Sequence, residues 1–346
     1  MFLSNRNRNF AAEWDQQDGI LIAWPHAGTD WAYMLDEVTA CYVEIAHAIL
    51  QDDERLLIIA PDSGEVHEAL GPDVDWSRID IIELPTNDTW VRDYGPITVW
   101  QNNRMSLADF TFNAWGMKFA ADCDNMVNSR LNDKGVFHLP LNNYRDFVLE
   151  GGSIETDGRG TILTTTCCLT SPNRNDTLSK EQMEQILLER LGCDKMLWLE
   201  HGSLAGDDTD GHIDTLARFA PDGTILYTGC DDPSDEHYEP LKAMESDLLT
   251  MTDANGNPYR LIKVPLPDAT FDEISRLPAT YVNFLVTNHQ IIVPTYGQPD
   301  NDLKACQIIS EAFPGRTIVG VDCQTLIRQH GSLHCATMQL PYGALK

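Results

Sequence analysis

Basic residues are scarce in this sequence. Its 346 residues include 24 Lys and Arg against 53 Asp and Glu, which gives a formal net charge of −29. A surface this acidic repels phosphate backbones, so binding to nucleic acid is not expected. The same charge attracts small cations and can focus them toward a cleft, although solubility alone would also account for it.

Long apolar runs are absent as well. No stretch approaches the roughly 20 apolar residues that a membrane-spanning helix needs. Residues 1–8 also lack the continuous apolar segment of a secretory signal. These two absences predict a cytoplasmic protein that does not enter membranes.

The cysteines lack the spacing of a metal site. None of the nine forms a Cys-x-x-Cys pair, so a zinc ribbon is not indicated. Without an export signal, reduced thiols are the default, and most of the nine are expected to be packing residues. We therefore expect no metal and no other cofactor.

Short strands and helices alternate, and no Ser/Gly-rich linker divides them, so one domain over residues 1–346 is expected. Apolar runs of strand length lie at 20–24, 56–60, 79–84 and 97–100. Helical spacing predicts helices at 38–50, 65–70, 183–191 and 302–313, with Ser63 capping the second and Gly192 ending the third. Hairpins are predicted around turns at 157–158, 221–223 and 288–289, the last with strands 282–286 and 291–294.

Hairpins mixed with helices do not suggest a plain doubly wound sheet. They suit a repeated ββαβ unit, although no repeat is visible in the letters of the sequence.

Four segments place charged or titratable residues beside glycine or in predicted turns. They are Trp90-Val91-Arg92-Asp93-Tyr94-Gly95-Pro96, Glu150-Gly151-Gly152, Gly211-His212-Ile213-Asp214 and His330-Gly331-Ser332-Leu333-His334-Cys335. A histidine beside a cysteine is by itself usually structural, because a thiol becomes a strong nucleophile only as thiolate. Alternation in the third segment predicts that His212 and Asp214 share one face of an extended chain.

Together and in this order, the four segments resemble the guanidine-modifying deiminases, most closely the agmatine deiminases and next the bacterial peptidyl-arginine deiminases. Residues 20–26, 112–116 and 281–284 extend the resemblance over most of the chain. It implies one deiminase catalytic domain over residues 1–346 with an α/β fold, a five-bladed α/β propeller of pseudo-symmetric ββαβ units whose site lies at the central axis. The run of three glycines common before the cysteine is replaced by Gln329-His330-Gly331-Ser332, which leaves the shape of that loop open.

The resemblance also implies the catalytic residues, which are Cys335, His212, Asp93, Glu150 and Asp214. Cys335 would attack the guanidinium carbon, and His212 would protonate the leaving ammonia and then deprotonate water. The three carboxylates would hold the guanidinium or the imidazolium by charge-assisted hydrogen bonds. Candidate substrate-binding residues are Trp90, Trp115, Asn283 and Asp210, the last in an acidic run that fails as a calcium loop at both ends.

Each assignment has a structural alternative. Asp93 would pair with Arg92 or act as a turn residue, Glu150 would end a strand at a glycine bulge, His212 and Asp214 would be a strand-edge pair or cap, and Asn283 would be a core asparagine. His330 and His334 would either tune the thiol or pack, and packing is the simpler interpretation.

The absence of a matched basic residue other than Arg92 favours a guanidine substrate without a carboxylate. Agmatine fits, and its hydrolytic deimination through an amidino-cysteine intermediate would give N-carbamoylputrescine and ammonia. Alternatives are an arginine or peptidyl-arginine deiminase, an amidinotransferase, a metal-dependent hydrolase and a non-catalytic binding propeller. The expected partner is therefore a small cationic guanidine, and whether the protein forms a homo-oligomer stays open.

Overall fold

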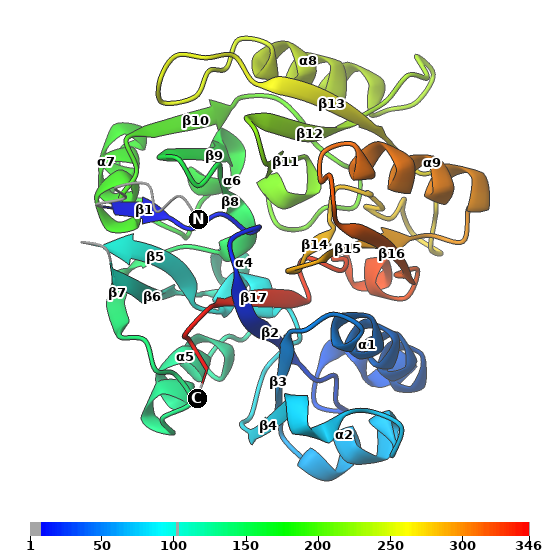
Figure 1. The fold of residues 1–346 in the computed structure, drawn as a ribbon. Coiled ribbons are helices and arrows are strands. Elements are labelled where there is room, and N and C mark those ends of the chain that lie inside the picture. Colours follow the sequence, from blue (N-terminus) through cyan, green and yellow to red (C-terminus); the bar gives the residue numbers. More distant parts are fainter. Residues whose placement is uncertain (1–7, 102–103, 346) are drawn as a thin grey trace.

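A computed structural model describes residues 8–101 and 104–345 of the chain. Within these residues the strands form five separate sheets, which Figure 1 shows set around the middle of the molecule. Each sheet contains both antiparallel and parallel neighbours. The protein therefore has a mixed α/β fold built from several small sheets.

Four sheets follow one another along the chain. The first has the order β1 (Arg8–Phe10), β5 (Ile97–Gln101), β6 (Arg104–Thr111) and β7 (Leu141–Val148). The second has the order β10 (Lys195–Leu199), β9 (Thr161–Thr165) and β8 (Ile154–Thr156). The third and fourth contain β11 (Ala217–Ala220), β12 (Thr224–Gly229) and β13 (Arg260–Pro265), then β14 (Leu285–Val286), β15 (Gln290–Thr295) and β16 (Thr317–Asp322).

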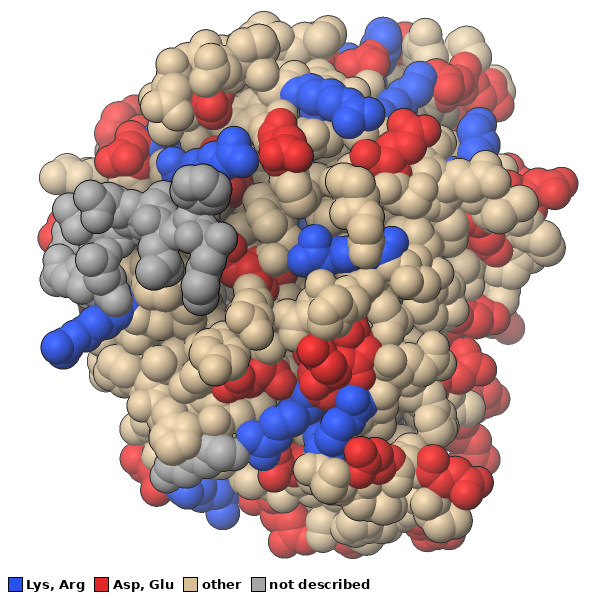
Figure 2. Space-filling view, in the orientation of Figure 1, with Lys and Arg blue, Asp and Glu red and all other residues tan. Residues whose placement is uncertain are grey.

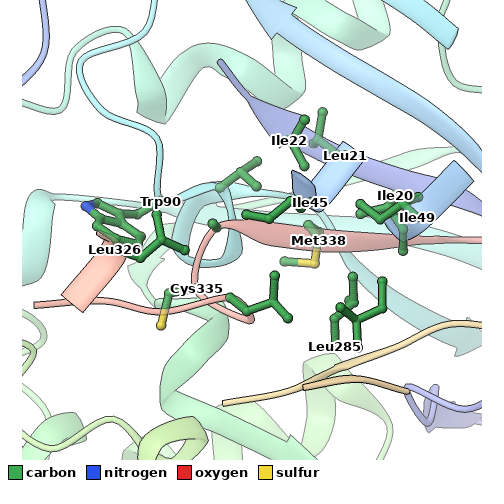
Figure 3. Close-up of a cluster of buried hydrophobic side chains, with 14 of the residues drawn as sticks. Ile20, Leu21, Ile22, Ile45, Ile49, Trp90, Leu285, Leu326, Cys335 and Met338 are labelled. Carbon is green, nitrogen blue, oxygen red and sulfur yellow. The ribbon is translucent and has the colours of Figure 1, made fainter. Parts of the chain in front are cut away.

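The fifth sheet joins the two ends of the described chain. Its order is β17 (Thr337–Pro341), β2 (Gln17–Ala23), β3 (Arg55–Ala60) and β4 (Ile79–Glu83), and β17 runs antiparallel to β2. This pairing fixes the chain just after Cys335. Figure 3 shows Cys335 at one end of an apolar cluster, near Trp90 and Leu326, on the stretch that leads to Met338 in β17.

Helices make the crossovers that parallel strands require. They are α1 (Leu35–Leu50), α2 (Ser63–Leu70), α5 (Val127–Asp133), α7 (Lys180–Leu191), α8 (Tyr238–Leu248) and α9 (Pro299–Ser310). In every sheet, one antiparallel pair is followed by a helix-containing crossover and a parallel strand. Shorter turns of helix are α3 (Val91–Tyr94), α4 (Ala114–Met117) and α6 (Thr166–Leu169), with 3-10 turns η1 (Asp30–Met34), η2 (Trp76–Arg78), η3 (Asp124–Met126), η4 (Gly151–Ser153), η5 (Ile213–Thr215) and η6 (Leu326–Gln329).

Most of the predicted elements are confirmed, and two details are wrong. Gly192 ends α7 in the left-handed conformation, as predicted, at φ 70°. The cap of α2 is Asp62, whose side chain accepts from Gly64 N, and not Ser63, which lies inside the helix. β14 begins only at Leu285, so Asn283 lies in a loop and not in a strand.

Charge on the surface is distributed widely. Figure 2 shows acidic side chains along much of the rim of one face, interspersed with Lys and Arg, and not gathered in a single patch. None of the helices in residues 8–101 and 104–345 is long and apolar enough to cross a membrane.

Candidate active site

The five predicted catalytic side chains meet in one buried place. Asp93 lies in α3, Glu150 directly precedes η4, His212 and Asp214 lie before and within η5, and Cys335 precedes β17. Each of the five is at most 6% exposed. Segments far apart in the sequence therefore come together as the motifs predicted.

Gly152 shows how closely these side chains approach. A Cβ at this position would lie 2.7 Å from His212 Nδ1, 2.8 Å from Asp93 Oδ1 and 3.0 Å from Asp214 Oδ2. The backbone N–H of Gly152 also donates to Asp93 Oδ1 at 2.9 Å. Only glycine leaves room for the three side chains to converge here.

The segment that carries His212 and Asp214 is not extended, and that prediction is wrong. Ile213–Thr215 forms the 3-10 turn η5, and Gly211 before it has φ 91°. A buried bond from Thr165 Oγ1 to Gly211 O, 2.6 Å long, holds the start of this turn. The turn depends on contacts across the fold, which alternation of polar and apolar residues does not reveal.

The Cys335 thiol is buried among polar groups. Its Sγ lies 3.3 Å from Asn283 Nδ2 and 3.6 Å from Asp214 Oδ2. Burial raises the pKa of Cys335 well above its usual value, and the negative charges of Asp214 and Asp93 raise it further. Both effects favour the thiol over the thiolate in the free protein.

The His212 imidazole lies between two acids. Its Nδ1 is 3.6 Å from Asp93 Oδ1, and its Nε2 is 3.9 Å from Glu150 Oε2. Burial acts to lower the pKa of His212, but the charges of Asp93, Glu150 and Asp214 outweigh it and raise the pKa above its usual value. Burial raises the pKa of Asp93 to about 6, although His212 acts in the opposite direction.

Two polar atoms in this site are buried without a partner. His212 Nε2 and Asp214 Oδ1 have no hydrogen bond from any described residue. Such atoms carry a cost of about 1–3 kcal/mol each unless something else satisfies them. The carboxylate of Asp214 lies beside the Cys335 thiol, so its free oxygen can accept from a ligand, whereas the raised pKa of His212 makes its Nε2 a donor.

Arg174 holds Glu150 in place, and no sequence motif predicted this contact. Its Nε donates to both carboxylate oxygens of Glu150 at 3.0 Å, and both side chains are fully buried. The residue lies in a loop after α6, in none of the matched motifs. Only the three-dimensional contact links position 174 to position 150.

The carboxylate of Asp210 is hydrogen-bonded to other side chains of the protein, and Asp210 does not line the cavity at Cys335. Its carboxylate accepts from Arg174 Nη1 at 2.7 Å, Lys118 Nζ at 2.9 Å and Ser171 Oγ at 3.0 Å. The acidic run nevertheless reaches the site through Asp208, which does line that cavity.

The two predicted tryptophans border the site. Trp115 Nε1 donates to Asp93 Oδ2 at 2.8 Å. The ring of Trp90 packs against Gly331, where a Cβ would lie 2.4 Å from the ring. Both rings line a cavity of about 30 Å³ that reaches Cys335 and Asp93 at its inner end. Phe119, His330 and the acids Asp30, Asp88 and Asp208 line the same cavity, and Phe119 and Asp30 among them are exposed.

Arg92 faces away from this cavity. Its guanidinium is buried and donates to Glu13 Oε1 at 3.2 Å and to Gln339 Oε1. No Lys or Arg belongs to the described residues that line the cavity at Cys335. Arg92 is therefore not placed to bind a substrate carboxylate.

Three groups of side chains in the described part of the chain lie close enough together to hold an ion. They are Glu150 with Cys168 and His212, Glu13 with Glu155 and His334, and Asp52 with Asp53 and His289. In the first two groups the acids already pair with Arg174 or Arg218, whose positive charge opposes a bound cation.

Comparison with solved structures relates this site to known proteins. A protein of Porphyromonas gingivalis, provisionally assigned as an arginine deiminase, is 50% identical, with TM-score 0.93 and coverage of 98% of this chain and 100% of that one. C. jejuni agmatine deiminase with substrate bound is 38% identical, with TM-score 0.90 and full coverage of both chains. The agmatine deiminase of Stutzerimonas stutzeri is 35% identical over 95% of this chain and 94% of its own.

The family match covers nearly the whole chain. Residues 9–341 match the Porphyromonas-type peptidyl-arginine deiminase family, and this range includes all four motifs and every side chain of the site. The extent of this match, the identities and the shared fold agree with one another, and the chain belongs to the Porphyromonas-type peptidyl-arginine deiminase family.

Proposed function

We propose that the protein hydrolyses agmatine to N-carbamoylputrescine and ammonia. The observation that carries this proposal is the buried pair of carboxylates, Asp93 and Asp214, beside the thiol of Cys335, with Asp214 Oδ1 left without a hydrogen-bond partner among the described residues. A planar guanidinium offers N–H donors to Asp214 and Asp93 while its carbon faces the sulfur. Full-length similarity to agmatine deiminases supports the same reaction.

The geometry supports a proposed role for each of these residues. The Cys335 sulfur forms a bond to the guanidinium carbon, and the C–N bond to the departing nitrogen breaks. His212, whose pKa is raised, supplies the proton with which that nitrogen leaves as ammonia. The imidazole then takes a proton from water, the hydroxyl adds to the carbon, and the C–S bond breaks to release the urea product.

The charged mouth of the cavity supports agmatine over arginine. Burial raises the pKa of Asp88 to about 7, and the neighbouring charges of Asp30 and Asp208 add to this effect. A second cationic group at this end of the substrate would relieve the repulsion among the three acids. The carboxylate of arginine would instead meet these acids without a basic partner.

A side-by-side assay tests the substrate. Ammonia release from agmatine, arginine and benzoyl-arginine amide should show a kcat/KM for agmatine that is higher by orders of magnitude. Asp88→Asn and Asp208→Asn should raise KM for agmatine more than they lower kcat, because neither acid belongs to the five side chains proposed to act on the reacting carbon. Asp73→Asn, at an exposed acid that does not line the cavity, is a control that should leave both constants unchanged.

Arginine and peptidyl-arginine are the competing substrates. The provisional name of the Porphyromonas gingivalis relative and the name of the family favour them. Comparable turnover of agmatine and either arginine compound would contradict the agmatine proposal and leave the deiminase chemistry standing.

We further propose that the five sheets are the blades of an α/β propeller within a single catalytic domain over residues 1–346. The repeated order of antiparallel pair, crossover and parallel strand supports this architecture. The pairing of β17 with β2 supports closure of the ring between the first and last blades.

A further inference from the structure

The segments Arg92–Asp93 and Glu150–Gly151 form a floor beneath the site, and this floor separates two cavities. Asp93 and Glu150 face the catalytic side, whereas their chain neighbours Arg92 and Gly151 line a second cavity of about 60 Å³. Residues of β1, β5, β6, β8, the start of β2, the end of β17 and the loop before β2 form the rest of its wall, and Figure 1 shows β2 and β17 crossing near the middle of the fold. A water needs about 10–15 Å³ of such space and polar partners, so this cavity can hold several waters.

One histidine spans the floor between the cavities. His334 is 1% exposed, its Nδ1 lies 2.8 Å from Asp214 Oδ2, and its Nε2 lies 2.7 Å from Glu13 Oε1. Asp214 Oδ2 is in turn 3.6 Å from Cys335 Sγ, and Glu13 lines the second cavity. A continuous chain of hydrogen-bonding groups therefore runs from the thiol to the other side of the floor.

The hydrogen bonds of His334 to Asp214 and Glu13 constrain how many protons these three side chains hold together. Ionised carboxylates only accept hydrogen bonds, and a neutral imidazole has a single N–H. Both short contacts of His334 are satisfied only if a second proton resides on the imidazole or on one of the acids. Burial, Arg218 and Arg92 all act to lower the pKa of His334, so this second proton is weakly held.

Catalysis requires a proton to leave the thiol. In the free protein the pKa of Cys335 is raised, and the thiolate forms when a guanidinium cation enters beside Asp93 and Asp214. The same substrate fills the narrow cavity at Trp90 and Trp115, which closes the direct route to solvent.

We propose that Asp214, His334 and Glu13 form a proton path from the Cys335 thiol to the second cavity. This inference rests on the proposed deiminase function. The sulfur gives its proton to Asp214, Asp214 passes one to His334 Nδ1, and His334 Nε2–H passes one to Glu13 and on to water. The thiol regains a proton by the reverse route when the neutral urea product leaves, so no proton is consumed over the cycle.

Charged groups around the path favour transfer without trapping the proton. Arg92 and Arg218 contact Glu13, and Glu155 contacts Arg218. On the catalytic side, His212 and Asp93 lie close to Asp214. Burial acts to raise the pKa of Glu13, but Arg218, His334 and Arg92 outweigh it and lower the pKa, so Glu13 gives the proton up readily.

A proton-release experiment tests the path. Rapid mixing with excess agmatine in weak buffer with a pH indicator should show a burst of about one proton per site before ammonia forms. In Glu13→Gln and His334→Gln the burst should slow by about a hundredfold, the size of effect typical of a positioned acid-base group. Glu200→Gln and His201→Gln are the matched controls, because both residues are exposed and line neither cavity, and their burst rates should equal that of the wild type.

The outcomes separate the inference from the proposed function. Absence of both burst and ammonia in the wild type means that agmatine is not the substrate. Ammonia without a burst, or an unchanged burst rate in both path variants, would overturn the proton path and leave the function intact. Circular dichroism establishes that each variant is folded, and slowing of the wild-type burst in D2O supports the path without any substitution.

Discussion

At the scale of single residues, the decisive group is the thiol of Cys335. We expect Cys335→Ala to lose more than about 99% of kcat, which corresponds to a barrier increase of about 3 kcal/mol or more. The reason is the loss of covalent catalysis at a side chain that already has hydrogen bonds to Asn283 and Asp214. Ammonia release measures the effect, and thermal unfolding monitors the fold.

A covalent adduct provides an independent check. With an S-alkyl-isothiourea analogue of agmatine, whose thiolate leaves without a proton from His212, His212→Ala should trap the amidino group on the peptide that contains Cys335, which mass spectrometry detects. A Cys335→Ala variant that keeps more activity than this limit would show that another group is the nucleophile.

A second residue-scale prediction concerns the ionisation of this thiol. Because the pKa of Cys335 is raised in the free protein, alkylation by neutral iodoacetamide should be slow at pH 7 and should accelerate only as the pH rises above the usual cysteine range. A small guanidinium analogue that leaves the sulfur accessible should speed the reaction at pH 7, since its positive charge favours the thiolate.

The alternative is a preformed thiolate–imidazolium pair with His212. Such a pair would react rapidly near neutral pH with no analogue present. A free thiol that titrates well below about 8.5 would exclude activation by the substrate, though not the identity of the nucleophile.

At the scale of elements, α4 is an unusual turn that positions a site residue. Ala114, Trp115, Gly116 and Met117 all have positive φ, from 53° to 84°. Left-handed backbone costs about 1–2 kcal/mol for each residue with a side chain. Trp115 nevertheless reaches Asp93, so this strain is maintained where it holds a carboxylate of the proposed active site.

Gly116→Ala tests this interpretation. At φ 84° its Cβ would lie 3.0 Å from Pro172 O, so we expect a stability loss of about 1 kcal/mol or more and a fall in kcat/KM as Trp115 shifts. Gly343 has the same φ and no neighbour within 4 Å. Gly343→Ala should therefore show a similar loss of stability in urea unfolding and retain full activity. Equal activity of the Gly116→Ala and Gly343→Ala variants would contradict a role for α4.

Elements whose formation depends on neighbouring residues could be predicted from the sequence. Elements that depend on contacts with distant parts of the chain could not. Apolar spacing located α1, and Gly192 located the end of α7. The 3-10 turn at Ile213 was missed because it depends on a bond between Thr165 and Gly211.

The same distinction holds within the site. Motifs predicted the meeting of Cys335 with Asp214, whose positions follow from the family resemblance. Arg174, Asp88 and the contact of His334 with Glu13 involve partners that no motif contains. Side-chain contacts between loops far apart in the chain become visible only in the folded structure.

At the scale of the whole molecule, the net charge of −29 has two competing explanations. Solubility requires only that the acids be spread over the surface, and the face in Figure 2 fits this explanation. Electrostatic steering requires that the summed field also draw cations to the mouth, where Asp30, Asp88 and Asp208 lie. The two explanations predict different responses to salt.

Steering predicts that kcat/KM for agmatine falls severalfold between about 0.05 M and 1 M NaCl while kcat stays constant. The screening length shrinks from more than about 10 Å to about 3 Å over this range, which removes the long-range field but not the buried contacts at Asp93 and Asp214. For butylguanidine, which has one positive charge and no distal amine, kcat/KM should fall less than for agmatine, because the field acts on half the charge. A kcat/KM that is independent of salt for both compounds would leave solubility as the role of the acidic surface.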